Sequence, residues 1–402
     1  MGSVSWCAME PPAASRPLVS IVVPVFNAGP YLDQALDSLT GQTYENLEII
    51  CLNDGSTDDS LAIMERCAAE DGRMRIIDKA NEGYGATCNR GIDEAHGDWI
   101  AILEPDDWLL PGAIAAMVNA AEKAARAIDG PNASASVPAI PDLVKTPYWR
   151  VLFPNTPKQT LVHCYYKGAA APANATALPD GWLAQGSPAI ASCTALMEYH
   201  PSIWSALYRA DFLREHGIRF LPIPGAGWAD NPFLVETMAA ARSIVYLDTP
   251  FYCYREETPT HFEETIRRQP TLVFDRWHDG TDVLEHHPDL DDHVVQAHYH
   301  RGFNNRDKAA AVLGDTSPLV QSETARMFGR MKAALVLDDP ALSPAQKTLF
   351  ARTTGRPDYH PTLADKLAFK GRALRQQLHN VRTVGLKGAR AIRRLRRKAP
   401  LL

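Results

Sequence analysis

The sequence predicts an α/β fold of the doubly wound type, followed by a mainly helical C-terminal region. Short apolar runs rich in β-branched residues alternate with segments whose apolar residues recur at helical spacing. Nearly continuous apolar runs of this kind are typical of parallel strands buried on both faces. Beyond about residue 265 the pattern is mainly helical, and Pro270, Pro288 and Pro340 interrupt it.

Four apolar runs predict the first four strands, and a helix is predicted after each of the first three. The runs are residues 18–25, 47–52, 74–78 and 99–103. The first helix is the best defined, because Pro30 suits a first helical turn and Leu32, Leu36 and Leu39 form one apolar face. We expect a turn at residues 53–56, and a third helix that follows the glycine-rich segment 81–91.

The second half of the sequence has weaker patterns. Further strands are predicted at residues 142–146, 149–153 and 243–247, and an aromatic run occupies residues 251–254. Segments rich in proline, glycine and small residues are interpreted as loops, at residues 129–141 and 168–189. Six histidines between His278 and His300 are expected to lie on a solvated helical face.

The charge is unevenly distributed along the 402 residues. The chain has 41 Lys and Arg and 47 Asp and Glu, for a formal net charge of −6. Residues 366–402 hold 12 basic residues and no acidic one, which leaves residues 1–365 strongly acidic. An acidic body is a poor surface for nucleic acid, so we expect no nucleic-acid partner.

The cysteines and the apolar segments exclude several protein classes. The seven cysteines are scattered without a Cys-x-x-Cys pair, so neither a zinc site nor a disulfide framework is predicted and a reducing compartment is favoured. No run approaches the roughly 18 apolar residues of a membrane span, and no secretory signal pattern is present at the N-terminus. The expected location is cytoplasmic.

Three polar clusters follow predicted strands, at the sheet edge where ligands bind in open α/β folds. They are residues 24–27, 53–58 and 104–107. Together they could hold a nucleotide base, a ribose and a metal-bound diphosphate. Neither a P-loop nor a Gly-x-Gly-x-x-Gly motif after the first strand is present, so nucleotide hydrolysis of the P-loop type and hydride transfer receive little support.

The third cluster is the strongest candidate for a metal site. Glu104, Asp106 and Asp107 place three carboxylates within four residues, and they repel one another unless a cation neutralises them. Carboxylate oxygens suit Mg²⁺ or Mn²⁺. The alternative is a solvated turn whose aspartate caps a helix. In the second cluster, Asp54 could accept a hydrogen bond from a base ring, or the run could be a turn and a helix cap.

These motifs, in this order, resemble those of inverting family 2 glycosyltransferases, which have the GT-A fold. The resemblance covers about residues 18–260 and rests on residues 19–60, 81–108, 204–213, 217–222, 228–233 and 252–255. It implies a Rossmann-like nucleotide-diphospho-sugar transferase fold with a nucleotide-sugar-binding half at 18–128 and an acceptor-binding half at 142–260. The predicted organisation also includes a disordered N-terminal tail at 1–17, a helical extension at 261–365 and a basic amphipathic tail at 366–402.

The resemblance also implies roles for individual residues. Four positions are implied to lie at the base: Pro24, Phe26, Asp54 and Asp78. The other predicted substrate-binding residues are Asn27, Gly83, Asn89, Glu104, Asp106 and Trp228. It implies Asp106 and Asp107 as ligands of Mn²⁺ or Mg²⁺. Glu104 stands where the family usually has Asp. Cys88 stands where it has Arg, so one donor contact of the family is missing.

The general base that the resemblance implies is Asp230. The family usually has a Glu-Asp pair here, whereas this chain has Ala229 and Asp230, so the aspartate remains and the glutamate is absent. A carboxylate can take the proton of an acceptor hydroxyl as the oxygen attacks the sugar. Alternatively, Asp230 could cap a helix. Trp228, Trp204, Tyr148, Trp149 and Trp182 could stack on an acceptor sugar or belong to the core.

The function implied by the resemblance is transfer of one sugar, from a nucleotide-diphosphate sugar such as a UDP-sugar, to a glycan or lipid-linked acceptor in cell-surface polysaccharide synthesis. Two alternatives stay open: transfer to a lipid phosphate carrier, and a non-catalytic relative that binds nucleotide sugars or glycans. The Gln-x-x-Arg-Trp motif of processive synthases is absent, because Val273 stands at the Gln position before Arg276 and Trp277. Processive synthesis is therefore disfavoured.

The basic tail is a separate candidate for binding. Apolar residues such as Leu367, Leu374 and Leu378 lie among its basic residues, which suits an amphipathic helix on the anionic inner face of the plasma membrane. The tail could equally dock on the acidic body or remain disordered. The first reading predicts a peripheral membrane protein.

Overall fold

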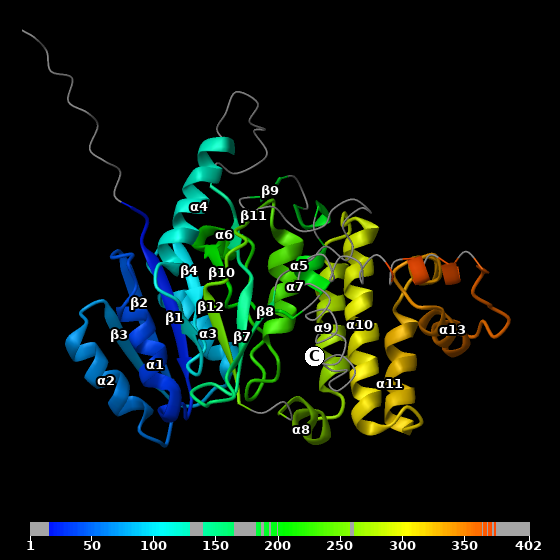
Figure 1. Cartoon of the computed structure of the whole chain (residues 1–402), viewed down its shortest axis with the longest axis horizontal. Helices are drawn as coiled ribbons and strands as arrows, with labels where there is room; N and C mark the ends of the chain where they lie inside the picture. The colour runs from blue at the N-terminus through cyan, green and yellow to red at the C-terminus, as the bar shows by residue number, and fades with distance from the viewer. Residues whose placement is uncertain are drawn as a thin grey trace, which may run out of the picture.

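The computed structural model describes residues 16–128, 140–164, 182–185, 189–192, 194–198, 200–257, 261–363, 365–367, 369–371 and 374. Two β-sheets form the N-terminal two thirds, and helices cover the larger sheet. A bundle of helices, yellow to orange in Figure 1, follows on one side. The predicted α/β fold with a helical C-terminal region is confirmed.

The larger sheet has eight strands and is parallel in the part that the sequence predicted best. The first four strands in its spatial order are parallel to one another, and β10 is antiparallel to both β4 and β6. The parallel strands therefore end at one edge. The spatial order is β3 (Met74–Lys79), β2 (Leu47–Asp54), β1 (Val19–Val25), β4 (Trp99–Ile102), β10 (Ala206–Arg209), β6 (Leu143–Lys145), β11 (Ser243–Tyr246) and β9 (Trp182–Gln185).

Four helices belong to the first half of the chain. The helix α3 packs against β1 and β2, and α4 packs against β6 and β11. Their bounds are α1 (Gly29–Thr40), α2 (Ser60–Glu70), α3 (Tyr84–Glu94) and α4 (Ala113–Ile128). Two boundaries differ from the prediction. The strand β2 continues through Asp54, and α3 begins inside the glycine-rich segment because Cys88 and Ile92 give that segment a buried face.

The smaller sheet joins the two halves of the domain. Its strand order is β5 (Trp108–Leu109), β12 (Tyr252–Glu256), β7 (Tyr148–Leu152) and β8 (Thr160–Cys164). The strand β12 is antiparallel to β5 from the first half and parallel to β7 from the second. The strand β9 lies within residues 168–189, so the prediction of a loop was wrong there, because its backbone pairs along β11.

The remaining elements are helical. They are η1 (Ala189–Ser192), α5 (Ala195–Glu198), α6 (Ala210–Glu215), α7 (Asp230–Ala240), α8 (His261–Arg268), α9 (Leu272–Glu285), α10 (Asp292–Leu313), α11 (Pro318–Gly329), α12 (Ala333–Leu337) and α13 (Pro344–Thr353). The last six build a second apolar core around Trp277, Phe303, Phe328 and Phe350.

The prediction of a solvated histidine face was wrong for half of the tract. His286 and His293 are exposed, but His278, His298 and His300 are buried. For His298 and His300 the reason is that α10 is enclosed, because it packs against α5, α8, α9, α11 and α12, while His278 lies on α9, which packs against α7, α10 and α11. A helix with so many neighbours has little free surface, so histidines on it must find partners inside the protein.

Among the described residues, no helix is long and apolar enough to cross a membrane. The predicted tail at residues 366–402 lies almost wholly outside the described residues. Its binding to an anionic membrane surface, and with it the predicted location, stays a prediction.

Candidate active site

The loops after β1 and β2 lie against each other at the edge where the parallel strands end. The Asn27 backbone N–H donates to Ser56 Oγ at 3.0 Å, and Asn27 Oδ1 accepts from the Thr57 N–H at 2.8 Å. Pro24 is buried within β1, whereas the Phe26 side chain is 51% exposed. An apolar ring presented at this edge can stack on a planar base.

Asp54 holds the segment after β3 against the end of β2. Its carboxylate accepts hydrogen bonds from the Glu82 N–H at 2.9 Å, from the Gly83 N–H at 3.0 Å and from Lys79 Nζ. Burial alone would raise the pKa of Asp54, but the bonds from Lys79 and Glu82 outweigh it, so the pKa lies below its usual value. Asp78 accepts from Asn53 Nδ2 at 2.7 Å. Direct contact of Asp54 and Asp78 with a base stays a prediction.

The start of α3 packs tightly on residues 220–225. Gly83 has a φ of 90°, and a Cβ there would lie 2.8 Å from the Ile223 carbonyl oxygen. At Gly85 a Cβ would lie 2.2 Å from the Leu221 carbonyl oxygen, so this contact requires glycine. The Asn89 amide bonds the Phe220 backbone N–H and carbonyl, each at 2.9 Å. These contacts fix the segment that leads to Asp230.

Asp107 is part of the supporting structure of the acidic turn. It is 1% exposed, and it accepts from the Tyr252 hydroxyl at 2.8 Å and from the Arg255 N–H at 2.7 Å. Arg255 Nε also donates to the Asp106 carbonyl at 2.6 Å. The turn continues into β5 and not into a helix, so the interpretation of this cluster as a helix cap was wrong.

The structure brings Glu104, Asp106 and Asp230 close enough for their charges to interact. Burial raises the pKa of the Glu104 carboxyl to about 8, and the charges of Asp106 and Asp230 add to the shift, against a hydrogen bond from the Tyr84 hydroxyl. Asp106 is exposed. Residues far apart in the sequence thus form one acidic site between β4 and α7.

Asp230 is the first residue of α7 and does not cap it. The N-cap is Ala229, and Asp230 Oδ1 accepts from Asn231 Nδ2 at 3.0 Å. Arg301 of α10 donates to Asn231 Oδ1 and, at 3.0 Å, to the Met197 carbonyl. Burial raises the pKa of Asp230, while the positive charge of Arg301 acts in the opposite direction. A more basic carboxylate is a better proton acceptor.

Trp228 is placed beside the acidic site in an unusual backbone conformation. Its φ is 53°, in the left-handed region that β-carbon-bearing residues seldom adopt, and its ring stacks on Phe262 with centroids 5.5 Å apart. Trp204 and Tyr148 are buried and pack together in the core, as the alternative interpretation predicted. The Trp182 side chain lies outside the described residues.

The acidic site fits a divalent cation that is shared with a substrate. The described residues contain no group of three His, Cys, Asp or Glu side chains that could hold a metal ion by themselves. Mg²⁺ is commonly held by one or two carboxylates together with substrate phosphates. Exposed Asp106 and neighbouring Glu104 meet that description. Burial is the main cause of the raised pKa of Glu104, and a cation there would offset the repulsion from Asp106 and Asp230 that adds to it.

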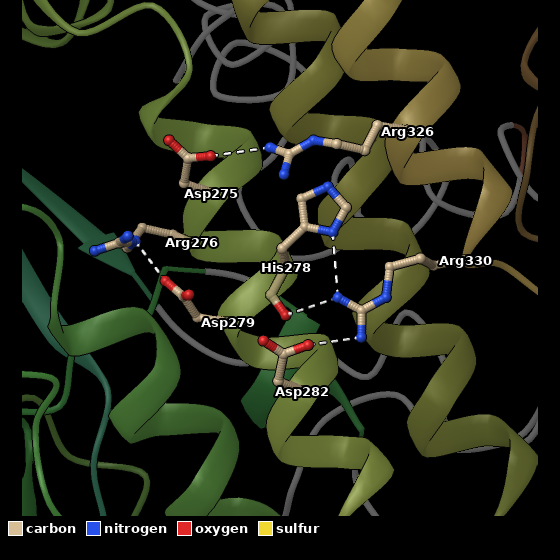
Figure 2. A pocket seen from close by; sticks show the side chains of 7 residues that line it. All are labelled: Asp275, Arg276, His278, Asp279, Asp282, Arg326 and Arg330. Carbon is tan, nitrogen blue, oxygen red and sulfur yellow. Dashed lines mark hydrogen bonds and ion pairs between the residues drawn. The ribbon is translucent and has the colours of Figure 1, made fainter.

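A separate pocket lies between α9 and α11 and does not belong to this site. It has a volume of about 610 Å³, and no predicted site residue lines it. Figure 2 shows that its charged side chains point toward one another. They form ion pairs, Arg326 with Asp275, Arg276 with Asp279 and Arg330 with Asp282. Because these charged side chains are already paired with one another, few of their charges are available to bind a ligand.

Several residues that hold the site had no role assigned to them from the sequence. Tyr84, Tyr252 and Arg255 hold the acidic turn, and Arg301 reaches Asn231 from a helix about 70 residues away in the chain. Tyr252 and Arg255 lie in the aromatic run at residues 251–254 and directly after it, which was the available clue.

Comparison with known proteins supports the fold and the family. A protein-family model described as glycosyl transferase family 2 matches residues 20–164. The putative glycosyltransferase EpsH of Bacillus subtilis is 30% identical over 264 residues, which are 64% of this chain and 65% of EpsH. The chain thus spans just under two thirds of that relative.

Solved structures show the same fold at low identity. Residues 1–349 of S. aureus TarS in complex with UDP align with a TM-score of 0.61 and 14% identity, over 89% of this chain and 91% of that chain. The complex of the same protein with UDP-GlcNAc gives 0.59 and 15% identity, over 89% and 92%. Residues 20–164 thus match the model of glycosyltransferase family 2, and the chain has the GT-A fold.

Proposed function

We propose that this protein is an inverting, metal-dependent glycosyltransferase that moves one sugar from a UDP-sugar to a hydroxyl of a glycan or lipid-linked acceptor. The observation that carries the proposal is the placement of Asp230 beside Glu104 and Asp106 at the edge where the parallel strands end. The TarS structures in complex with UDP and UDP-GlcNAc support a uridine nucleotide as the donor.

The proposed reaction uses the chain's own carboxylates in two roles. Asp230 takes the proton of the acceptor hydroxyl as that oxygen bonds to the anomeric carbon. The bond from this carbon to the diphosphate breaks on the opposite face, so the configuration inverts and the diphosphate leaves with the electron pair. Asp106, with Glu104 beside it, would hold Mn²⁺ or Mg²⁺, which when bound offsets the negative charge of the diphosphate.

Donor binding with and without metal tests this proposal directly. We expect calorimetry to show binding of UDP and a UDP-sugar that is at least tenfold tighter with Mn²⁺ than with EDTA. GDP-mannose in the same titration tests the choice of base. Equally tight binding in Mn²⁺ and in EDTA would contradict the proposed metal dependence. Absence of binding to every nucleotide sugar would contradict the proposed glycosyltransferase function. Binding without any transfer or hydrolysis would favour a non-catalytic relative.

The two neighbouring aspartates are expected to separate metal binding from stability. We expect Asp106→Asn to remove the tightening by Mn²⁺ and leave folding unchanged, because Asp106 is exposed. Asp107→Asn should lower the free energy of unfolding by about 1–3 kcal/mol, since two buried donors lose a carboxylate acceptor. Calorimetry and urea unfolding measure the two effects. If only Asp107→Asn abolished the tighter donor binding in Mn²⁺, and did so without lowering stability, then Asp107 and not Asp106 would be the metal ligand.

A further inference from the structure

A lysine of the helical extension, Lys308, has no anionic partner among the described residues. The Lys308 side chain extends from α10 and is partly buried, with Nζ 5.2 Å from the centre of the Phe262 ring. Within the described part of the chain, its ammonium forms neither an ion pair nor a hydrogen bond with a side chain or the backbone. Nearby Arg150, in contrast, pairs with Glu256, with Nε and Oε2 2.9 Å apart.

The surroundings of Lys308 are positively charged. Burial lowers the pKa of Lys308 to about 8, and the charges of Arg301 and Arg150 add to the shift. Arg150 has Glu256 and Arg301 has Asp230 as an acidic neighbour, whereas Lys308 has no counterion among the described residues, so an anion that binds at Lys308 gains attraction and offsets the cost of burying its charge. The position therefore suits an anionic ligand better than a neutral one.

Lys308 is also aligned with the proposed base. Arg301 and Lys308 are seven residues apart on α10, which is two helical turns on one face, or about 10 Å along the axis. Arg301 contacts Asn231 next to Asp230, while Lys308 lies over Phe262, whose ring stacks on Trp228. One face of α10 thus runs from the base past an aromatic pair to an ammonium group.

We propose that the acceptor carries a phosphate or carboxylate group, which Lys308 binds while an acceptor hydroxyl lies at Asp230 and a sugar ring contacts Trp228. This inference rests on the proposed function for the position of the hydroxyl. Its test does not, because binding of an anion at Lys308 can be measured without donor or transfer. The shared chemistry is a negative charge, and the two kinds of anion are tested separately.

The test uses three probes that differ only at C6: glucose, glucuronate and glucose 6-phosphate. Their binding to the full-length protein without donor is measured by ligand-observed NMR. We expect at least one anionic probe to bind about tenfold or more tightly than glucose. A hydrogen bond to a charged group typically contributes a gain in affinity of this size. Lys308→Ala should remove this preference, and Lys308→Arg should keep most of it. The matched control is Lys332→Ala, at an exposed lysine elsewhere in the helical extension.

Equal binding of all three probes by the wild type, or a preference that survives Lys308→Ala, would overturn the inference. Calorimetry with UDP is run on the same proteins. A loss of UDP affinity in Lys308→Ala would assign Lys308 to the donor diphosphate and would also overturn it. Failure of the wild type to bind any nucleotide would instead count against the proposed function, while the probe comparison still decides the inference.

Discussion

Asp230→Asn is expected to lower the rate of sugar transfer about 10²–10⁴-fold and to leave UDP affinity within a factor of two. This range is the usual contribution of a positioned general base. The amide has the same size and keeps a hydrogen-bonding oxygen for Asn231, so the start of α7 should be preserved. Transfer is measured as UDP release with acceptor present, and donor affinity by calorimetry.

The matched control is Asp289→Asn, which removes one carboxylate at an exposed position between α9 and α10. It should leave both quantities unchanged. Full transfer activity in Asp230→Asn would remove Asp230 from the role of base. Equal loss of donor affinity and rate would show that Asp230 contributes to donor binding and not selectively to the transfer step.

His300→Gln is expected to cost about 3 kcal/mol of unfolding free energy near pH 6. His300 of α10 is buried between two carboxylates, with Nδ1 2.6 Å from Glu198 Oε1 and Nε2 2.5 Å from Asp339 Oδ2. Breaking a buried charge pair leaves the remaining charges uncompensated and typically costs several kcal/mol. Because Glu198 belongs to α5, this histidine also ties the acceptor half to the helical extension.

The same histidine makes stability depend on pH. Burial alone would lower its pKa, but the bonds to Asp339 and Glu198 outweigh it and raise the pKa to about 9. The folded value lies above the unfolded value of about 6.5, so the stabilisation is complete below pH 6.5 and is lost as the pH rises through about 9. A shift of this size corresponds to about 3 kcal/mol.

Urea unfolding of the wild type and His300→Gln at pH 6, 8 and 10 measures this effect. We expect the difference between the two proteins to be largest at pH 6 and nearly absent at pH 10. His293→Ala, at an exposed histidine of the same helix, should show no such trend. A difference that stays constant from pH 6 to 10 would contradict the charged state assigned to His300.

The fold of the first half follows closely from the sequence because its signal is local. Ile21, Val22 and Val23 are buried within one strand, and the apolar run that they form is itself the evidence for that strand. The strand β9 was missed for the opposite reason. It is a short edge strand, and its pairing with β11 depends on residues about 60 positions away in the chain.

The site could be predicted only where a family motif marks it. Asp54, Glu104 and Asp230 have recognisable surroundings in the sequence, but the contacts that hold them do not. The family resemblance implied both Asp106 and Asp107 as metal ligands, and the role of each in metal binding stays a prediction. Asp107 is bonded to Tyr252 and is buried, whereas Asp106 is exposed. The composition of the acidic run does not distinguish the two residues.

The helical extension shows the limit of periodicity. The spacing of its apolar residues indicates helices, but it does not show how many neighbours each helix has. His300 and Lys308 both lie on α10, one bonded to two carboxylates and the other facing an aromatic ring. Such partners come from distant segments, so the difference appears only in three dimensions.

The strand order has a practical consequence for engineering. The two halves predicted at residues 18–128 and 142–260 share both sheets, since β10 lies between β4 and β6 and β12 pairs with β5. A chain cut between Ile128 and Ile140 would leave each fragment with unpaired strand edges. The two fragments would fold only by complementation, so recovered transfer activity would report their association, as in a split reporter.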